Sequence, residues 1–184
     1  MNYKITKCPL DGLLLLEPAV FTDSRGYFFE LWNKRTFTIL GLEIEFVQDN
    51  ISFSKKNCIR GLHFQNPHPQ AKLITVLEGL VFDVVVDLRK NSPTFGQWHS
   101  VTLSGDHIQQ LFIPIGFAHG FAVLSDYAIF HYKCSDFYSR DSELTLRWDD
   151  PDLKINWPVT TPILSEKDQQ GLFLRNIPPD RLFF

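Results

Sequence analysis

The sequence has little that would mark an exported, membrane-spanning or nucleic-acid-binding protein. Three cysteines, Cys8, Cys58 and Cys134, lie far apart among 184 residues, which excludes a disulfide framework and a zinc knuckle. The longest aliphatic run near the start covers residues 13–16 and is much shorter than a signal-peptide core or a membrane-spanning helix. A net charge of −3 provides no general attraction for nucleic acid or an anionic membrane. We therefore expect a soluble, cytoplasmic protein with reduced thiols and no nucleic-acid or membrane partner.

The composition is that of a folded domain. Hydrophobic residues make up 44% of the chain and charged residues 21%, so a sizeable core can close and a disordered chain is excluded. No low-complexity segment, internal repeat or composition break divides the sequence. The sequence therefore predicts one domain over residues 1–184.

Local periodicity favours strands over helices along most of the chain. Within residues 80–88 every second residue is apolar and lies on one face: Leu80, Phe82, Val84, Val86 and Leu88. This period of two is typical of a strand. Other short runs with strand character, separated by Gly, Pro, Asn, Asp and Ser, lie at residues 28–32, 46–50, 98–103, 110–114, 120–124 and 128–134. Many short strands with turn signals between them indicate a sandwich or a barrel.

Helical signals are confined to two short segments. Residues 33–40 are expected to form a helix that ends at Gly41, and Ser165 is a candidate N-cap for a helix that follows it. The apolar tail at residues 172–184 has no clear periodicity, so we expect it to pack on the body of the protein or on a partner subunit. We expect that partner to be a second copy of the chain, in a homodimer.

The most specific short pattern is the segment 114–119, a Pro-Gly turn that leads into a strand containing His119. This segment resembles the second motif of the cupin superfamily, in which the corresponding histidine points into a jelly-roll barrel. The resemblance predicts an all-β, cupin-type jelly-roll barrel with a few short peripheral helices. The alternative for His119 is a hydrogen-bonded histidine of the core.

The first cupin motif is altered at its metal-binding positions. In that motif a pair of histidines is followed by a glutamate that lies seven residues before a glycine. Counting back from Gly79 gives Lys72 at the glutamate position, and the histidine pair falls at Asn66 and His68. An ammonium group has no lone pair to offer a divalent ion. We therefore expect no metal and no other cofactor.

A barrel without a metal must perform chemistry with its own side chains. His63 has an ordinary pKa of about 6.5, which suits proton transfer at neutral pH. Tyr132 shares a strand face with Ala128 and Phe130, so its phenol could point inward and donate a proton. The alternatives are a histidine at the rim of a strand and a core tyrosine with a satisfied hydroxyl.

A shared site for Arg60 and His63 requires an irregular strand. Strict alternation would place these two residues on opposite faces, because they are three positions apart. Gly61 lies between them and could mark a β-bulge that redirects one side chain.

Seven segments follow one another along most of the chain. They lie at residues 20–30 (VFTDSRGYFFE), 46–50 (FVQDN), 60–63 (RGLH), 92–98 (SPTFGQW), 114–121 (PIGFAHGF), 148–151 (WDDP) and 163–168 (ILSEKD). Together, and in this order, they resemble the dTDP-4-dehydrorhamnose 3,5-epimerase family. The resemblance implies an isomerase of deoxysugar-nucleotide synthesis that inverts C3 and C5 of dTDP-4-dehydro-6-deoxy-glucose to give dTDP-4-dehydro-L-rhamnose.

The implied reaction needs a base, an acid and a partner for an oxyanion. C3 and C5 flank the C4 ketone, so removing a proton there gives an enolate, and reprotonation from the other face inverts the centre. The resemblance implies that His63 is the base and that Asp168 orients its imidazole. It further implies that Tyr132 is the acid on the opposite face and that Lys72 is the cation near the C4 oxygen.

The resemblance also implies a set of residues that bind the substrate: Arg25, Glu30, Gln48, Asp49, Asn50, Arg60, His119, Tyr138 and Lys167. Among these, the two arginines and the lysine would contact the diphosphate, since guanidinium groups suit phosphate oxygens. Tyr138 would stack on the thymine. For the arginines the alternative is ordinary solvated surface charge.

The sequence departs from the family at two places near this set. Ser139 and Arg140 follow Tyr138 where the family often has Ala-Pro, which bears on the nucleotide preference. Phe64 stands where many relatives have tyrosine, a change that we expect to leave proton transfer intact.

Three other functions remain open at the level of the sequence. A related enzyme could invert only one centre, act on another nucleotide or isomerise the keto group with much the same histidine and tyrosine. A metal-dependent cupin would need a carboxylate ligand that the motif lacks. A non-catalytic jelly roll that binds sugar nucleotides would keep the arginines and Tyr138 but would not need His63, Tyr132 and Asp168 together.

Overall fold

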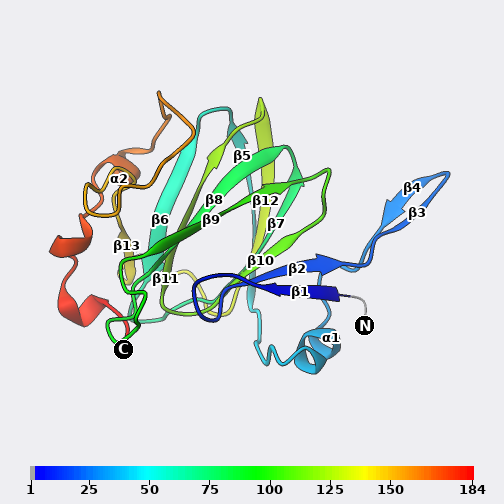
Figure 1. The fold of residues 1–184 in the computed structure, drawn as a ribbon, viewed down its shortest axis with the longest axis horizontal. Coiled ribbons are helices and arrows are strands. Elements are labelled where there is room, and N and C mark those ends of the chain that lie inside the picture. The colour runs from blue at the N-terminus through cyan, green and yellow to red at the C-terminus, as the bar shows by residue number, and fades with distance from the viewer. Residues whose placement is uncertain (1–2) are drawn as a thin grey trace.

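Two antiparallel sheets face each other in the computed structural model, which describes residues 3–184 (Figure 1). The six-stranded sheet has the order β1 (Tyr3–Lys7), β2 (Leu14–Pro18), β10 (Gln110–Ile113), β7 (Lys72–Glu78), β12 (Tyr127–Cys134) and β5 (Gln48–Lys55). The five-stranded sheet has the order β13 (Glu143–Thr145), β6 (Ile59–Gln65), β11 (Phe117–Val123), β8 (Leu80–Asp87) and β9 (Trp98–Ser104). This all-β arrangement confirms the jelly-roll fold predicted from the sequence.

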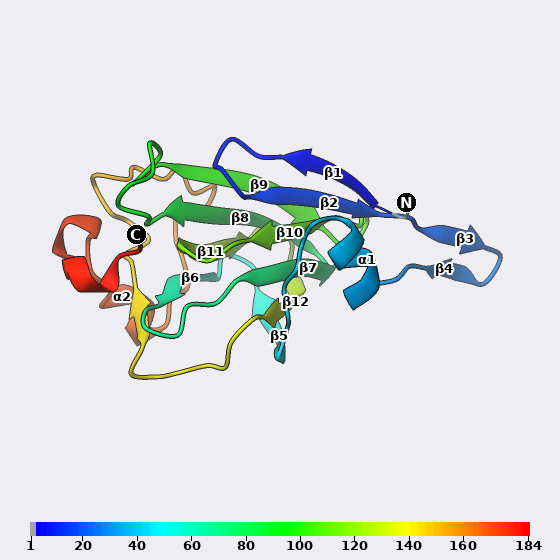
Figure 2. The same cartoon turned by 90° about the horizontal axis from the view of Figure 1, so that it is seen from below.

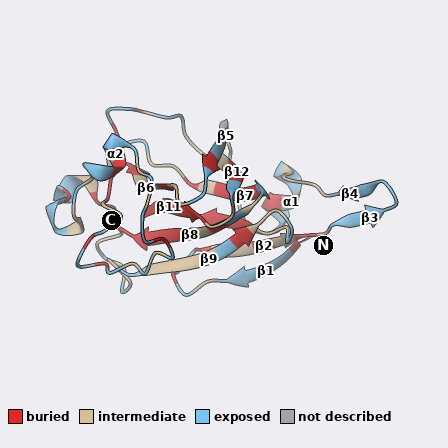
Figure 3. Ribbon diagram, turned by 90° about the horizontal axis from the view of Figure 1, so that it is seen from above, coloured by how far each residue is buried: buried red, intermediate tan, exposed pale blue. Residues whose placement is uncertain are grey.

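The remaining elements lie outside the two sheets. They are the hairpin of β3 (Phe21–Asp23) and β4 (Gly26–Phe28), the helices α1 (Lys34–Ile39) and α2 (Glu166–Gln169), and the 3₁₀ turns η1 (Leu174–Asn176) and η2 (Pro179–Arg181). The β3–β4 hairpin projects away from the barrel (Figures 1 and 2). Its six strand residues are all exposed, in contrast to the buried strands at the centre (Figure 3).

The barrel interior is filled by alternate residues of strands from both sheets. Val81 and Val85 of β8 meet Ile74 of β7 in one buried cluster. Across the interior, the rings of Phe121 and Phe130 stack with their centroids 4.1 Å apart. Full burial of such side chains stabilises the fold by about 1.5–3 kcal/mol each. The packed interior gives the polar side chains that share these strands a rigid support.

The outer face of the five-stranded sheet is covered by the C-terminal part of the chain. This part packs against the residues of β8 that alternate with the interior ones, Phe82, Val84 and Val86. It also packs against Leu88, which follows the strand. The covering side chains include Ile177, Leu182 and Phe183. The apolar tail therefore packs on the body of the protein, which was one of the two positions expected for it.

The outer face of the six-stranded sheet is only partly covered. The segment around α1 covers it with Phe37, which is buried against Leu16 and Leu73. Beyond this cover, on the edge strand β5, Ile51 is 68% exposed and Phe53 is 57% exposed. An apolar strip on an unpaired edge strand is a surface that proteins normally cover.

Most of the strand and helix predictions are confirmed, and one is wrong. The runs at 98–103, 110–114, 120–124 and 128–134 lie in β9, β10, β11 and β12 or extend one residue beyond them. Asn33 and Ser165 are the N-caps of α1 and α2. The run 28–32 is not a strand beyond Phe28. Its carbonyl groups accept hydrogen bonds from the side chains of Tyr3 and Gln110 instead of from a neighbouring strand.

Candidate active site

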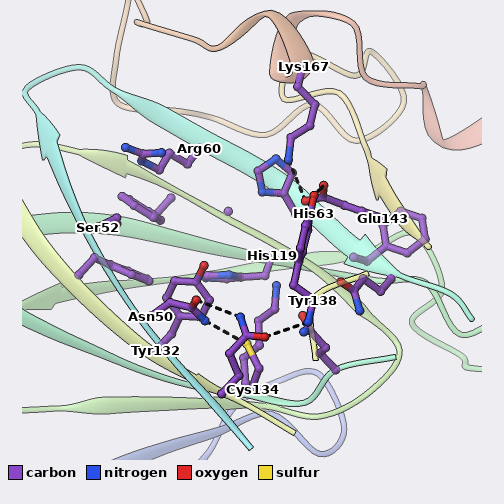
Figure 4. A pocket seen from close by; sticks show the side chains of 18 residues that line it. Asn50, Ser52, Arg60, His63, His119, Tyr132, Cys134, Tyr138, Glu143 and Lys167 are labelled. Carbon is purple, nitrogen blue, oxygen red and sulfur yellow. Dashed lines mark hydrogen bonds and ion pairs between the residues drawn. The ribbon is translucent and has the colours of Figure 1, made fainter. Parts of the chain in front are cut away.

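A pocket of about 430 Å³ opens between the two sheets (Figure 4). Its volume is in the range of small-molecule sites. Nine of the site residues predicted from the sequence line it: His63, Lys72, Tyr132, Gln48, Asn50, Arg60, His119, Tyr138 and Lys167. Asp168 lies directly behind the lining residue His63.

His63 and Asp168 form a hydrogen-bonded pair although they are 105 positions apart in the sequence. Nε2 of His63 lies 2.6 Å from Oδ1 of Asp168, whose residue is only 3% exposed. The Ser165 hydroxyl donates to Oδ2 of Asp168 at 2.7 Å, and the Gly61 amide donates to Oδ1 at 3.4 Å. These contacts fix the carboxylate, and the carboxylate fixes the imidazole ring. With Nε2 committed to Asp168, Nδ1 of neutral His63 is left as a proton acceptor.

A β-bulge brings Arg60 and His63 into the same pocket. His63 pairs with His119 on β11, whereas Arg60 pairs with Phe121, so β6 has one more residue than β11 between these two pairs. Gly61 has a φ of +110°, a conformation that favours glycine. The bulge predicted at Gly61 is confirmed.

Tyr132 and Lys72 face His63 from the opposite sheet. Tyr132 lies on β12 and Lys72 begins the neighbouring β7, where it pairs with Cys134. His63 lies on β6 of the other sheet. Figure 4 shows Tyr132 and His63 on different sides of the hollow. A ring bound between the sheets would therefore have an imidazole on one side and a phenol on the other.

Burial sets the proton affinities in the pocket. It lowers the pKa of His63 below its ordinary 6.5, with Asp168 acting in the opposite direction. It raises the pKa of Tyr132 above 10.0 and lowers the pKa of Lys72 below 10.5. Burial would also raise the pKa of Asp168, but the hydrogen bond and charge of His63, together with the hydrogen bonds from Ser165 and Gly61, outweigh it and the pKa is lowered. At neutral pH the site thus holds a free base and a protonated phenol.

Charged groups gather around the pocket at two further points. Arg60 is held by Ser54, whose hydroxyl oxygen accepts from Nε at 2.8 Å. Glu143 on β13 accepts from Nζ of Lys167 at 2.8 Å and from the Tyr138 hydroxyl at 2.9 Å (Figure 4). Because Lys167 and Asp168 are neighbours in α2, this short helix supplies both a cation to the pocket and the carboxylate that holds His63.

In the single chain, three of the predicted binding residues lie outside the lining of this pocket. Arg25 lies on the projecting hairpin and forms an ion pair with Asp23. Glu30 accepts hydrogen bonds from Asn33 and Thr36 beside α1. Asp49 points to the outer face of β5, because it alternates with the inward-facing Gln48 and Asn50. Its carboxylate is bound there by two residues of β12, His131 and Lys133.

The cupin positions that would carry a metal histidine pair lie away from the pocket lining. His68 is in a loop, with Nδ1 3.8 Å from Asp136, and the Asn66 side chain donates to the backbone of Leu182. Within residues 3–184, no group of three or more His, Cys, Asp or Glu side chains could hold a metal ion. In the same part of the chain, no helix is long and apolar enough to cross a membrane.

Sequence reasoning did not find two carboxylates of this site. Glu143 has no motif that would have indicated it. Asp83 had a signal that was overlooked, because it shares a face with Val81 and Val85 in the middle of an apolar strand, where a charged side chain must be buried. It is fully buried and bound to His119.

Comparisons with known proteins agree with this geometry. Residues 7–176 match the family model of dTDP-4-dehydrorhamnose 3,5-epimerase. The curated enzyme of that name from Methanothermobacter thermautotrophicus is 49% identical over 96% of this chain and 97% of its own length. Its counterpart from Pseudomonas aeruginosa is 51% identical over 91% of this chain and 94% of its own length.

A solved structure extends the likeness to the fold. It is the dTDP-6-deoxy-D-glucose-3,5-epimerase of Legionella pneumophila Philadelphia 1 in complex with dTDP-4-keto-L-rhamnose. It superposes with a TM-score of 0.95 at 46% identity, covering 98% of this chain and 97% of that one. A jelly roll with a histidine–aspartate pair opposite a tyrosine, and sequence identity over nearly the whole chain, lead to one assignment: the protein belongs to the dTDP-4-dehydrorhamnose 3,5-epimerase family.

Proposed function

We propose that the pocket inverts C3 and C5 of dTDP-4-dehydro-6-deoxy-glucose and so produces dTDP-4-dehydro-L-rhamnose. The observation that carries the proposal is the placement of proton-transfer groups on opposite sheets. Asp168 holds His63 on one sheet, and Tyr132 and Lys72 face it from the other. Epimerisation beside a ketone needs a base and an acid on opposite faces of one ring, and this arrangement supplies both.

The reaction proceeds through an enolate at each carbon. Nδ1 of His63 takes the proton from C3 or C5, and the electron pair of the broken C–H bond passes to the C4 oxygen. Tyr132 then delivers its proton to the opposite face of the same carbon. His63 returns its proton to water and Tyr132 takes one from water, which resets the site and allows solvent hydrogen to enter the product.

Lys72 is the proposed partner of the C4 oxygen. Its ammonium group is held by β7 inside the barrel, where little water competes for it. A fixed donor of this kind stabilises a developing oxyanion by about 3 kcal/mol, or roughly a hundredfold in rate.

The nucleotide end of the substrate is assigned to the charged groups around the pocket. Arg60 and Lys167 line the pocket and carry the positive charge that a diphosphate requires. Tyr138 is 54% exposed and its ring is available to stack on a thymine. Gln48, Asn50 and His119 supply polar contacts deeper in the pocket.

We further propose a homodimer in which Arg25 of one chain reaches the pocket of the other. The hairpin that carries Arg25 points away from its own barrel (Figure 2). It exposes Phe21 and Phe28 at 59% and 68%, and an apolar strip with Ile51 and Phe53 lies open on β5. Association of two copies would cover both surfaces.

The cytoplasm is the proposed location of this activity. Cys8, Cys58 and Cys134 are all free, as expected in a reducing compartment.

The reaction is tested by incubating the protein with dTDP-4-dehydro-6-deoxy-glucose in deuterated water and following both carbons by NMR. We expect deuterium at C3 and at C5 and inversion of both centres. Exchange at one carbon only would identify an enzyme that inverts a single centre. No exchange at either carbon would leave a sugar-nucleotide-binding protein and would refute the proposed reaction.

A further inference from the structure

A second carboxylate–imidazole pair lies in the wall of the same pocket, and the proposed proton transfers do not use it. Asp83 is fully buried on β8. Both of its carboxylate oxygens lie close to Nε2 of His119 on β11, at 3.0 and 2.9 Å. His119 lines the pocket and pairs across the sheet with His63. The two carboxylate–imidazole pairs are therefore neighbours in one wall.

The contact with Asp83 determines which ring nitrogen of His119 carries a proton. An ionised carboxylate can only accept hydrogen bonds, so Nε2 of His119 must be the donor. Burial raises the pKa of Asp83, while His119 and Lys72 oppose that change. A fully buried carboxylate keeps its charge only where such partners compensate it. Nε2 lies at nearly equal distances from the two carboxylate oxygens, 3.0 and 2.9 Å, as an N–H does when it donates to an ionised carboxylate. The geometry therefore combines an ionised Asp83 with a His119 ring that is protonated on Nε2.

The ring itself is held in a fixed orientation. His119 stacks on Phe130 with the ring planes 23° apart and the centroids 6.1 Å apart. No hydrogen bond from the described residues engages Nδ1, while both oxygens of Asp83 engage Nε2. A neutral imidazole with its proton on Nε2 has a lone pair on Nδ1. In a pocket that binds a sugar, such a lone pair is an acceptor for a hydroxyl group.

We propose that Asp83 is a positioning residue, which holds His119 in the tautomer protonated on Nε2 so that Nδ1 accepts a hydrogen bond from a hydroxyl group of the bound sugar. The inference rests on the proposed function, because the 4-keto-6-deoxy sugar of that reaction carries its free hydroxyl groups on C2 and C3. Asp83 would act through His119 and would not touch the substrate.

The decisive variant is Asp83→Asn, which keeps the size of the side chain but adds a donor. An amide can donate to Nε2 and thereby favour the tautomer protonated on Nδ1, which offers the sugar no acceptor. We expect kcat/KM to fall by about 10–100-fold, which is the effect of removing the hydrogen-bond partner of a metal-bound histidine. In ¹⁵N NMR spectra of the substrate-free protein we expect the His119 ring to change from protonation on Nε2 to protonation on Nδ1. The ring signals are assigned by comparison with His119→Gln.

Asp87→Asn is a matched control on the same strand. Asp87 is also fully buried on β8, but it binds Arg89, Ser92 and Thr94 outside the pocket lining. This variant should be less stable yet keep kcat/KM and the His119 ring signals of the unmodified protein. If Asp83 only stabilised the fold, Asp83→Asn would resemble Asp87→Asn: it would be less stable but would keep kcat/KM and the His119 ring signals.

The outcomes separate this inference from the proposed function. The tautomer of His119 is measured without substrate. The measurement therefore tests whether Asp83 fixes that tautomer even if no epimerisation is found. A ring protonated on Nδ1 in the unmodified protein would overturn the inference, and this result does not depend on whether Asp83→Asn folds. So would an Asp83→Asn protein with unchanged kcat/KM. Absence of deuterium exchange in the unmodified protein would instead overturn the proposed reaction.

Discussion

At the scale of single residues, His63 and Tyr132 acquire their chemistry from their surroundings. An exposed imidazole is about half protonated near pH 6.5, and burial moves that midpoint lower, so His63 is free to accept a proton at neutral pH. Burial acts in the opposite sense on the phenol of Tyr132 and keeps it protonated. The same physical effect thus suits His63 to its proposed role as base and Tyr132 to its proposed role as acid.

Replacing His63 with alanine tests the base. No other group is proposed to take the C3 and C5 protons, so His63→Ala should lower deuterium exchange at both carbons by about 100- to 10,000-fold. NMR in deuterated water measures the loss. Substantial exchange at either carbon would show that another residue removes that proton.

The pH dependence of the reaction tests the pair formed by His63 and Asp168. Protonation of His63 removes the base, so kcat/KM should fall on the acid side with a midpoint below pH 6.5. Asp168 raises the pKa of His63 by its hydrogen bond and charge. In Asp168→Asn that effect is lost, and the acid midpoint should move to still lower pH while kcat falls. A midpoint that moves upward would contradict the assignment.

Asp87 predicts a pH dependence of stability that is independent of the pocket. Burial opposes its ionisation, but hydrogen bonds from Arg89, Ser92 and Thr94 prevail and lower its pKa from 3.8 to about 2. A carboxyl group whose pKa is lowered by folding stabilises the fold at pH values above its pKa in the unfolded chain. This contribution is lost as the pH falls from about 4 to about 2. The shift corresponds to about 2 kcal/mol.

Urea unfolding of the unmodified protein and Asp87→Asn measures this contribution. The unmodified protein should be more stable at pH 6, and the difference should shrink by about 2 kcal/mol as the pH approaches 2. A difference that does not change with pH would mean that Asp87 stabilises the fold by packing alone.

At the scale of elements, the bulge in β6 decides whether Arg60 and His63 share a site. A Cβ atom on Gly61 would lie 2.6 Å from the carbonyl oxygen of His119 and 2.7 Å from Cα of Gly120. Gly61→Ala should therefore destabilise the protein by at least about 1–3 kcal/mol and lower kcat/KM as β6 and β11 separate.

Gly41 provides the matched control for this substitution. It also has a positive φ, +80°, but a Cβ atom there would meet nothing within 4 Å. Gly41→Ala should cost only the backbone strain of about 1–2 kcal/mol and leave kcat/KM unchanged. Urea unfolding and initial-rate measurements compare the two variants. Equal effects on activity would show that the bulge does not position the site.

The sequence predicts elements where local rules suffice. The alternation in residues 80–88 predicts β8, the helix expected over residues 33–40 corresponds to α1, and the N-cap residue Ser165 predicts where α2 begins. The run 28–32 is apolar enough for a strand, but its backbone is hydrogen-bonded by side chains from distant segments. No local pattern reports that competition.

The site residues also divide into those that local rules predict and those that depend on contacts between distant parts of the sequence. Tyr132 and His119 lie on strands whose period is visible in the sequence, so their inward direction can be predicted. His63 lies beside the bulge at Gly61, where strict alternation does not apply. The contact between His63 and Asp168 spans 105 positions, and no spacing rule reaches that far. The family resemblance supplied it, whereas Glu143 and Asp83 lay outside the motifs used.

At the scale of the whole molecule, the proposed homodimer can be tested by complementation. Arg25→Ala and His63→Ala should each have little activity alone, because each removes one part of every site. In a mixed dimer, the His63→Ala chain supplies Arg25 to the pocket of the Arg25→Ala chain, which retains His63. Random mixing after co-refolding should restore about a quarter of the normal number of complete sites.

Light scattering and assays of the mixture provide the measurement. A monomer in light scattering would refute the dimer. A dimer whose mixture recovers no activity would show that Arg25 serves its own chain or has no part in binding. His63→Ala mixed with the unmodified protein controls for the effect of refolding.

The position of α2 after the last strand has a consequence for biosynthesis. All strands of both sheets precede residue 146, whereas Asp168 arrives with α2 at residues 166–169. A nascent chain that has emerged only through β13 can already pair its strands, yet its His63 has no carboxylate to orient it. Assembly of the barrel and formation of the His63–Asp168 pair are therefore successive events during translation, and the second depends on residues that emerge after the last strand.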